Sequence, residues 1–150
     1  MSKKAVEKRK KRKQTKVMAF GTFDGLHPGH FHFFKQARDV AAHGFLIVSV
    51  ARDQNVLRIK GKLPVLNERK RAAVLKKTKL LDRVVLGGLV DYLSHIVKIR
   101  PDIIALGYDQ KDYVKNLKKD LEQKNLAVKI VRLKPYKAHI YKNALLRPRK

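Results

Sequence analysis

A ten-residue stretch, GTFDGLHPGH from Gly21 to His30, concentrates residues that can do chemistry. It follows an apolar run at 17–20, typical of a short buried strand, and precedes a helical pattern over residues 31–42. Its glycines let the backbone approach a ligand closely, and the N–H groups at a helix start attract anions. His27 and His30 are three residues apart, so one helical turn brings them to the same side. The stretch therefore predicts a phosphate cradle flanked by two imidazoles.

Two other interpretations of this stretch have to be weighed. It can be a purely structural turn, since a single glycine-rich turn is a weak signal. Two histidines at this spacing also suit zinc, but no third ligand is evident in the sequence. The chain contains no cysteine, which excludes disulfides, thiolate metal sites and cysteine nucleophiles.

Length and composition indicate one globular domain. The chain has 150 residues, and its 44% hydrophobic content is sufficient for a core. No run of eighteen apolar residues predicts a membrane span, and the N-terminus lacks the apolar segment of a secretory signal. We therefore expect a cytoplasmic protein.

The chain is strongly basic, with 37 Lys and Arg against 12 Asp and Glu, a formal net charge of +25. Residues 1–15 carry part of this charge and show no apolar periodicity, and we expect them to form a flexible basic N-terminal arm. The arm is either a solvated extension or a contact for RNA. The rest of the chain, 16–150, is also basic, which suits polyanionic ligands such as nucleotides.

Strand-like and helix-like segments alternate along the chain after the arm. This order predicts right-handed crossovers and a parallel sheet, an α/β fold of the Rossmann-like, doubly wound type with five strands. The expected strands are 17–20, 45–51, 82–86, 102–106 and 127–133, and the expected helices are 31–42, 69–77, 92–99, 111–124 and a short final 140–146.

Three loops, 21–30, 60–62 and 107–110, follow strands and are expected to converge on one cleft. Lys60 and Lys62 flank a glycine in a stretch expected to be a mobile basic loop, where they either reach phosphates or are simply solvated. Arg71 lies near a helix start, where the helix dipole does not favour a cation, which hints at a ligand. A solvated arginine is the plainer alternative.

The GTFD and HPGH residues together are similar to the first motif of the cytidylyltransferase-like nucleotidyltransferases, the HxGH superfamily. Later stretches resemble the archaeal-type FAD synthetases in particular. These stretches are Val50–Asp53, Ile59–Lys62, the E-x-x-R pattern of Glu68–Arg71, and Leu106–Gln110. In the glycerol-3-phosphate cytidylyltransferases the last of these loops usually ends in tryptophan, which Gln110 is not.

The resemblance implies nucleotidyl transfer, in which an acceptor phosphate attacks the α-phosphate of a nucleoside triphosphate and pyrophosphate leaves. His27 and His30 would donate to phosphate oxygens, Lys60 or Lys62 would neutralise the triphosphate, and Arg71 would meet the incoming phosphate or the leaving group. Asp24 would hold either the acceptor or a Mg²⁺-bound water. The residues expected to line the nucleotide site are Gly21, Thr22, Phe23, Asp24, Gly29, Gly107, Asp109 and Lys142.

The resemblance also implies the partners. Mg²⁺ would accompany the triphosphate, although its protein ligands are not evident. ATP with FMN, giving FAD, is the favoured pair, and CTP with a polyol phosphate such as glycerol 3-phosphate is the alternative. A homodimer is usual among such enzymes.

One departure from the family pattern keeps a third hypothesis open. The family's last motif is a Ser/Thr-rich turn that opens a helix and grips phosphates, whereas residues 138–143 read AHIYKN. Lys142 would supply charge there, and Asn143 would cap the helix. A degenerate, non-catalytic relative that binds RNA therefore remains an alternative.

Overall fold

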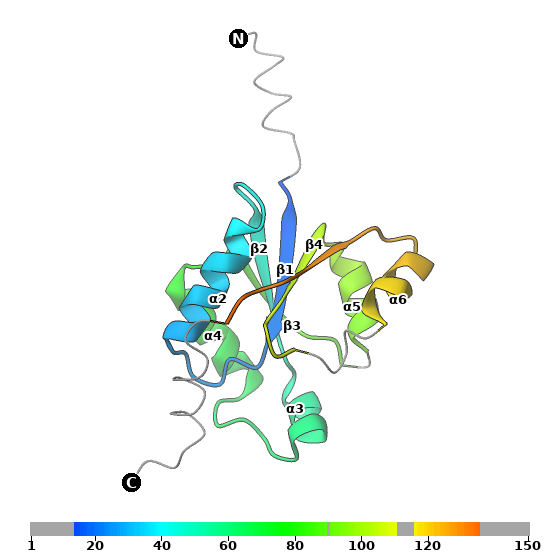
Figure 1. Ribbon diagram of the computed structural model, residues 1–150. Coiled ribbons are helices and arrows are strands. Elements are labelled where there is room, and N and C mark those ends of the chain that lie inside the picture. Colours follow the sequence, from blue (N-terminus) through cyan, green and yellow to red (C-terminus); the bar gives the residue numbers. More distant parts are fainter. Residues whose placement is uncertain (1–13, 90, 111–115, 136–150) are drawn as a thin grey trace, which may run out of the picture.

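Five parallel strands form the centre of the protein, as seen in a computed structural model that describes residues 14–89, 91–110 and 116–135. The order across the sheet is β3-β2-β1-β4-β5 (Figure 1). The strands are β1 Lys16–Gly21, β2 Phe45–Val50, β3 Arg83–Leu86, β4 Ile103–Leu106 and β5 Lys129–Arg132. The expected five-stranded parallel α/β sheet is confirmed.

Helices cover both faces of this sheet (Figure 1). They are α2 Pro28–Asp39 and α4 Glu68–Thr78 on one face, and α5 Tyr92–Ile99 and α6 Leu117–Gln123 on the other. The helix α3 Asp53–Lys60 lies beyond the carboxyl ends of the strands (Figure 1). Side chains of α2 and α4 pack with Val17 and Ala19, whereas side chains of α5 and α6 pack with Met18 and Ile104. Because successive strand residues point to opposite faces, β1 is buried on both sides, and this explains its unbroken apolar run.

The chain changes direction across the sheet once. It passes from β1 through β2 to β3, then returns to add β4 and β5 on the other side of β1. The strand order therefore reverses between β1 and β4, the place where parallel α/β sheets bind ligands at the carboxyl ends of their strands.

Most element boundaries lie within a few residues of the sequence expectations. Helix α2 begins at Pro28 rather than at residue 31, because His27 caps it. The expectation that Ile59 and Lys60 lie in a mobile loop was wrong, since both belong to α3. That helix ends at Gly61, which adopts the left-handed conformation with φ 79°.

Some expectations fall outside the described residues. These are residues 1–13 of the basic arm, the first part of the helix expected at 111–124, the altered motif at 138–143 with Lys142, and the final helix at 140–146. Within the described part of the chain, no helix is long and apolar enough to cross a bilayer.

Candidate active site

A cleft of about 1350 Å³ opens at the carboxyl ends of the strands. Its walls come from the loop after β1, from α3 and the residues before it, from the turn after β3, and from the loop after β4. Of the three loops expected to converge on one cleft, 21–30 and 107–110 contribute to its wall. From the third stretch, 60–62, only Lys60 lines the cleft, and it lies at the end of α3. Single small-molecule sites enclose roughly 300–1,000 Å³, so this cleft has room for two substrates.

His27 and His30 are fixed by hydrogen bonds at the start of α2. His27 Nδ1 accepts a hydrogen bond from the Gly29 N–H at 3.0 Å, and His30 Nδ1 accepts one from the His27 N–H at 3.2 Å. The two rings stack with centroids 3.9 Å apart. Because each Nδ1 accepts, the neutral form of each ring carries its proton on Nε2. Both rings line the cleft.

The environment keeps both imidazoles neutral. Burial lowers the pKa of His27. Burial, followed by the proximity of His27, lowers the pKa of His30 to about 4. At neutral pH and without a ligand the pair therefore presents N–H donors that carry no positive charge.

Two glycines are needed for this arrangement of rings. A Cβ on Gly29 would lie 2.7 Å from His27 Cε1, and a Cβ on Gly21 would lie 2.6 Å from Phe23 Cζ. Phe23 is buried with φ 54°, and its ring meets that of His30 edge to face at 5.4 Å. The motif thus places its aromatic and imidazole rings where only glycine leaves enough space.

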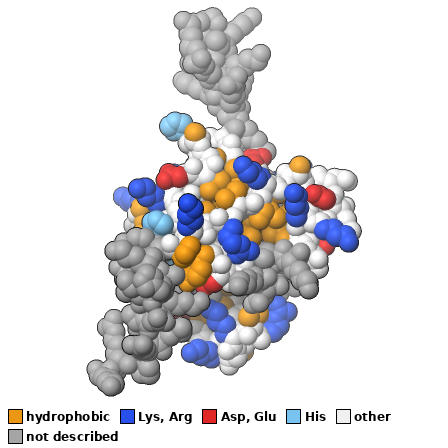
Figure 2. Space-filling model, viewed as in Figure 1, with side chains coloured by type: hydrophobic (Ala, Val, Ile, Leu, Met, Phe, Trp, Pro, Cys, Tyr) orange, Lys and Arg blue, Asp and Glu red, His pale blue; other side chains and the backbone are white. Residues whose placement is uncertain are grey.

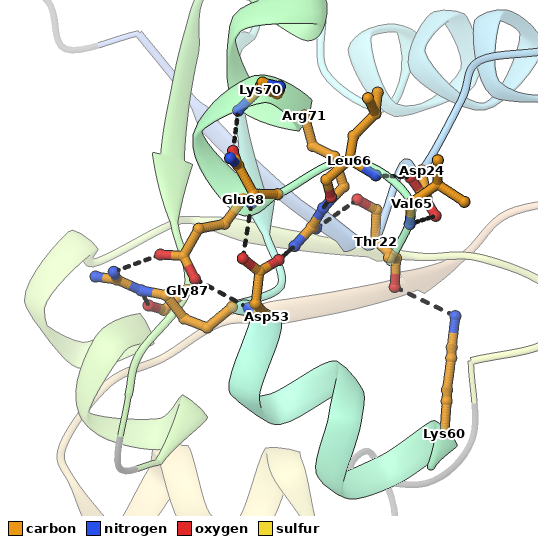
Figure 3. Close-up of polar contacts among 12 residues, drawn as sticks. Thr22, Asp24, Asp53, Lys60, Val65, Leu66, Glu68, Lys70, Arg71 and Gly87 are labelled. Atoms are coloured by element: carbon orange, nitrogen blue, oxygen red, sulfur yellow. Dashed lines mark hydrogen bonds and ion pairs between the residues drawn. The ribbon is translucent and has the colours of Figure 1, made fainter. Parts of the chain in front are cut away.

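Asp24 anchors the loop that precedes α4. Its two carboxylate oxygens accept hydrogen bonds from the Val65 N–H at 2.7 Å and the Leu66 N–H at 2.9 Å (Figure 3). Partial desolvation opposes ionisation, but these hydrogen bonds, with the cations of Arg71 and Lys60, lower the pKa of Asp24. This carboxylate is therefore committed to the protein's own backbone in this structure.

The two candidate lysines differ in position. Lys60 Nζ lies 3.3 Å from Thr22 Oγ1 and lines the cleft (Figure 3). Lys62 is exposed beyond Gly61 and does not line the cleft. Lys60 is therefore the better placed of the two to meet a phosphate held by the loop after β1.

Arg71 lies beneath the cleft rather than in its wall. It is fully buried, and its guanidinium contacts three partners: Asp53 Oδ1 at 2.6 Å, the Leu66 carbonyl at 2.9 Å and the Thr22 carbonyl at 2.8 Å (Figure 3). All three belong to segments that form or support the site. Arg71 thus ties these segments together, and its role towards a phosphate remains a prediction.

Two carboxylates extend this network, and the sequence analysis had given neither a role. Asp53 Oδ2 accepts the Glu68 N–H at 3.1 Å, and Glu68 Oε1 accepts the Asp53 N–H at 3.0 Å, so the starts of α3 and α4 cap each other. Glu68 also pairs with Arg52 Nη1 at 2.8 Å, and Arg52 Nε donates to the Gly87 carbonyl at 2.7 Å. In the sequence, the only sign of this contact was an acidic residue at the start of each helix. That Asp53 and Glu68 face each other depends on the tertiary fold.

The loop after β4 is held by two further residues that the sequence had not assigned. Gln110 accepts from the Gly107 N–H at 2.8 Å and donates to the Phe20 carbonyl at 2.7 Å, which joins the ends of β4 and β1. Arg132 Nη1 donates to the carbonyls of Gly107 and Gln110 at 2.8 and 2.7 Å. Gly107 and Asp109 line the cleft, as expected.

Lys and Arg side chains are spread over the face drawn in Figure 2, with fewer acidic side chains among them. The positive charge of the described residues is thus general on this face rather than confined to one patch. Such a surface attracts anionic ligands without specifying which one.

Comparison with known proteins identifies the family that uses this arrangement. The sequence profile described as cytidylyltransferase-like matches residues 18–145, which includes both the histidine pair and the loop after β4. The chain belongs to the cytidylyltransferase-like family. It is therefore a nucleotidyltransferase, as the histidine motif at the start of α2 had indicated.

Relatives of this family member come from archaea. A protein named FAD synthase from Methanothermus fervidus is 45% identical over 80% of this chain and 83% of its own length. Another of that name from Thermoplasma volcanium is 37% identical over 88% of this chain and 91% of its own.

Solved structures agree on the fold. A crystal structure described as a lipopolysaccharide core biosynthesis protein from Thermoplasma volcanium has a TM-score of 0.76 at 39% identity, covering 83% of this chain and 99% of that one. A pantoate-beta-alanine ligase from Francisella tularensis has a TM-score of 0.55 at 14% identity, covering 86% of this chain and 62% of that one, and shares the fold alone.

Proposed function

We propose that this family member is an FMN adenylyltransferase, which joins ATP and FMN to give FAD and pyrophosphate. An oxygen of the FMN phosphate attacks the α-phosphorus of ATP, the bond from that phosphorus to the bridging oxygen breaks, and pyrophosphate leaves with the electron pair. The FAD synthase relatives, which match most of the chain at 36–45% identity, carry this proposal.

The histidine pair would stabilise the transferring phosphate. Phosphoryl and nucleotidyl transfers depend mainly on positioning and on stabilising charge, with little covalent work for the protein. The Nε2–H groups of His27 and His30, held in one tautomer by the start of α2, are donors for the α- and β-phosphate oxygens. Lys60, beside Thr22, supplies the positive charge that the neutral histidines lack.

The nucleoside would lie at the reversal of strand order between β1 and β4. Gly107 and Asp109 line the cleft, and Gly21, Thr22 and Phe23 line it after β1, where their backbone N–H groups would bind the phosphates. The triphosphate would thus run from the loop after β4 towards the histidine pair.

The Mg²⁺ ion that this reaction needs would enter the site bound to the triphosphate. Among the described residues, no three His, Cys, Asp or Glu side chains form a cluster able to hold a metal ion. Mg²⁺ is usually bound through substrate phosphates and one or two carboxylates rather than in an all-protein cage. When bound, it would neutralise the developing negative charge, and Asp109 is a carboxylate in the cleft wall that could contact it.

The test is turnover by the full-length protein with Mg²⁺, ATP or CTP, and FMN or glycerol 3-phosphate, with pyrophosphate and FAD measured separately. We expect FAD only with ATP and FMN. His30→Ala should retain the fold and lose activity by roughly 10²–10³, the effect of removing one well-placed donor, whereas His43→Ala, an exposed histidine outside the cleft, should not. Pyrophosphate release only with CTP and glycerol 3-phosphate would refute the proposal.

A further inference from the structure

A polar pair lies in the cleft wall at the ends of β2 and β3, away from the histidine motif. Ser49 Oγ and His95 Nε2 are 2.9 Å apart, and both residues line the cleft. Ser49 is only 3% exposed and lies between Val48 and Val50 in an otherwise apolar strand. Burying a hydroxyl costs free energy unless it is hydrogen-bonded, and His95 is the partner that makes a serine tolerable at this position.

The turn after β3 lies beside this pair and is held by two side chains. A Cβ on Gly87 would lie 3.2 Å from the Val50 carbonyl oxygen, which is a tight contact, and 3.7 Å from Ser49 Oγ, which is an ordinary one. A Cβ on Gly88 would lie 2.5 Å from the Asp91 carbonyl oxygen. Arg52 Nε holds the Gly87 carbonyl at 2.7 Å, and Asn55 Nδ2 holds the Gly88 carbonyl at 2.9 Å.

The topology places the pair on the side of the cleft opposite the expected nucleoside position. β4 neighbours β1 on one side, and β2, which carries Ser49, neighbours it on the other. With the nucleoside between β1 and β4 and the phosphates at the end of β1, the part of the cleft beyond β2 would be left for the second substrate. Ser49 and His95 form the polar floor of that part.

The pair offers a specific hydrogen-bonding pattern. Burial, followed by the cations of Arg52 and Lys98, lowers the pKa of His95, so the imidazole is neutral. A neutral imidazole either accepts the Ser49 hydroxyl proton at Nε2 or donates its own Nε2–H to Oγ. In the second arrangement the Ser49 hydroxyl keeps its proton and a lone pair, so it is both a donor and an acceptor for a ligand.

We infer that the Ser49–His95 pair recognises the head group of the acceptor, and that the group it fits is a planar ring with adjacent N–H and C=O, as in the imide edge of a flavin. The inference rests on the proposed function and adds to it the residues that select the acceptor. A polyol phosphate has no such edge, so the pair would also favour FMN over glycerol 3-phosphate.

The test combines variants with a modified substrate. KM and kcat for ATP and for FMN are measured in the wild type, Ser49→Ala, His95→Phe and the control His43→Phe, which makes the same exchange at an exposed site outside the cleft. Each protein is also assayed with FMN methylated at its imide nitrogen. Thermal unfolding of each variant checks that it is folded, and His95→Gln replaces His95→Phe if the latter is not.

We expect Ser49→Ala and His95→Phe to raise KM for FMN by about tenfold, the loss expected for one or two ligand hydrogen bonds, with KM for ATP unchanged. Methylation of the imide nitrogen should raise KM for FMN by a similar factor in the wild type and in His43→Phe. In Ser49→Ala it should raise KM by much less. FAD formation with an unchanged KM for FMN, or an equal methylation penalty in wild type and Ser49→Ala, would overturn the inference alone. A wild-type protein that makes no FAD would overturn the proposed function and this inference with it.

Discussion

Replacing Arg71 by methionine should destabilise the fold as well as the site. The variant removes the ion pair with Asp53 and the donors to the Leu66 and Thr22 carbonyls. Breaking a buried ion pair by removing one partner costs about 3–5 kcal/mol. Asp53 keeps the Glu68 N–H and its side chain is 26% exposed, so the lower end applies, and we expect a loss of about 3 kcal/mol in the free energy of unfolding.

The assay is urea unfolding at 25 °C followed by circular dichroism, together with kcat and KM. The matched control is Arg69→Met, which makes the same exchange at an exposed position of α4. For a chain of this size, 3 kcal/mol corresponds to a decrease in Tm of roughly 6–12 °C, whereas Arg69→Met should change the free energy of unfolding by less than about 0.5 kcal/mol.

A different result would refute this reasoning. If Arg71→Met lost activity but unfolded at the same urea concentration as Arg69→Met, Arg71 would act on a phosphate and not on the framework. Arg71→Lys, which keeps the charge but cannot reach three partners at once, should fall between the wild type and Arg71→Met in stability.

Three further predictions concern the phosphate site. Gly29→Ala should fold but lose about tenfold or more in kcat/KM, because a Cβ 2.7 Å from the His27 ring displaces it; unchanged kinetics would contradict this steric argument. Lys60→Ala should raise KM for ATP several-fold and Lys62→Ala should not, because of these two lysines only Lys60 lines the cleft. Equal KM values for the two variants in steady-state assays would contradict this assignment. The pKa of His30 is lowered to about 4, whereas an unfolded histidine titrates near 6.5. The unfolded chain therefore holds more protons between these values, and the free energy of unfolding should decrease as pH falls from about 6.5 to about 4. His30→Gln should show a smaller decrease when urea unfolding is compared at pH 7 and pH 5.

The sequence predicted the sheet and the histidine motif well, because both depend on local patterns. The apolar run at 17–20 indicates a buried strand by itself. Around His27 and His30, the glycines and the residues typical of a helix start indicate a strand-to-helix connection. The contacts of Arg71 could not be predicted from local patterns, because its partners lie 5, 18 and 49 residues away in the chain. Only the folded arrangement distinguishes a buried, paired arginine from one that faces a ligand.

The Ser49–His95 pair illustrates an intermediate case. A serine inside an apolar strand was visible in the sequence, and it marks a position where burial alone does not explain the residue. Its partner is 46 residues away on α5, so the sequence offered no means of joining the two. Gln110 is similar, since its contact with the Phe20 carbonyl requires β4 to lie beside β1.

The ion-pair network beneath the site has a consequence for how the family can diversify. Its charged members, Arg52, Asp53, Glu68 and Arg71, lie within twenty consecutive positions, so one short segment of the chain carries all four. His95 on α5 comes from a later part of the chain, and the turn after β3 joins the network through the Gly87 and Gly88 carbonyls. In a chimera of two relatives joined between α4 and β3, the histidine pair and this network would stay intact, whereas His95 and the loop after β4 would be replaced together. Ser49 of one parent would then have to meet the α5 residue of the other.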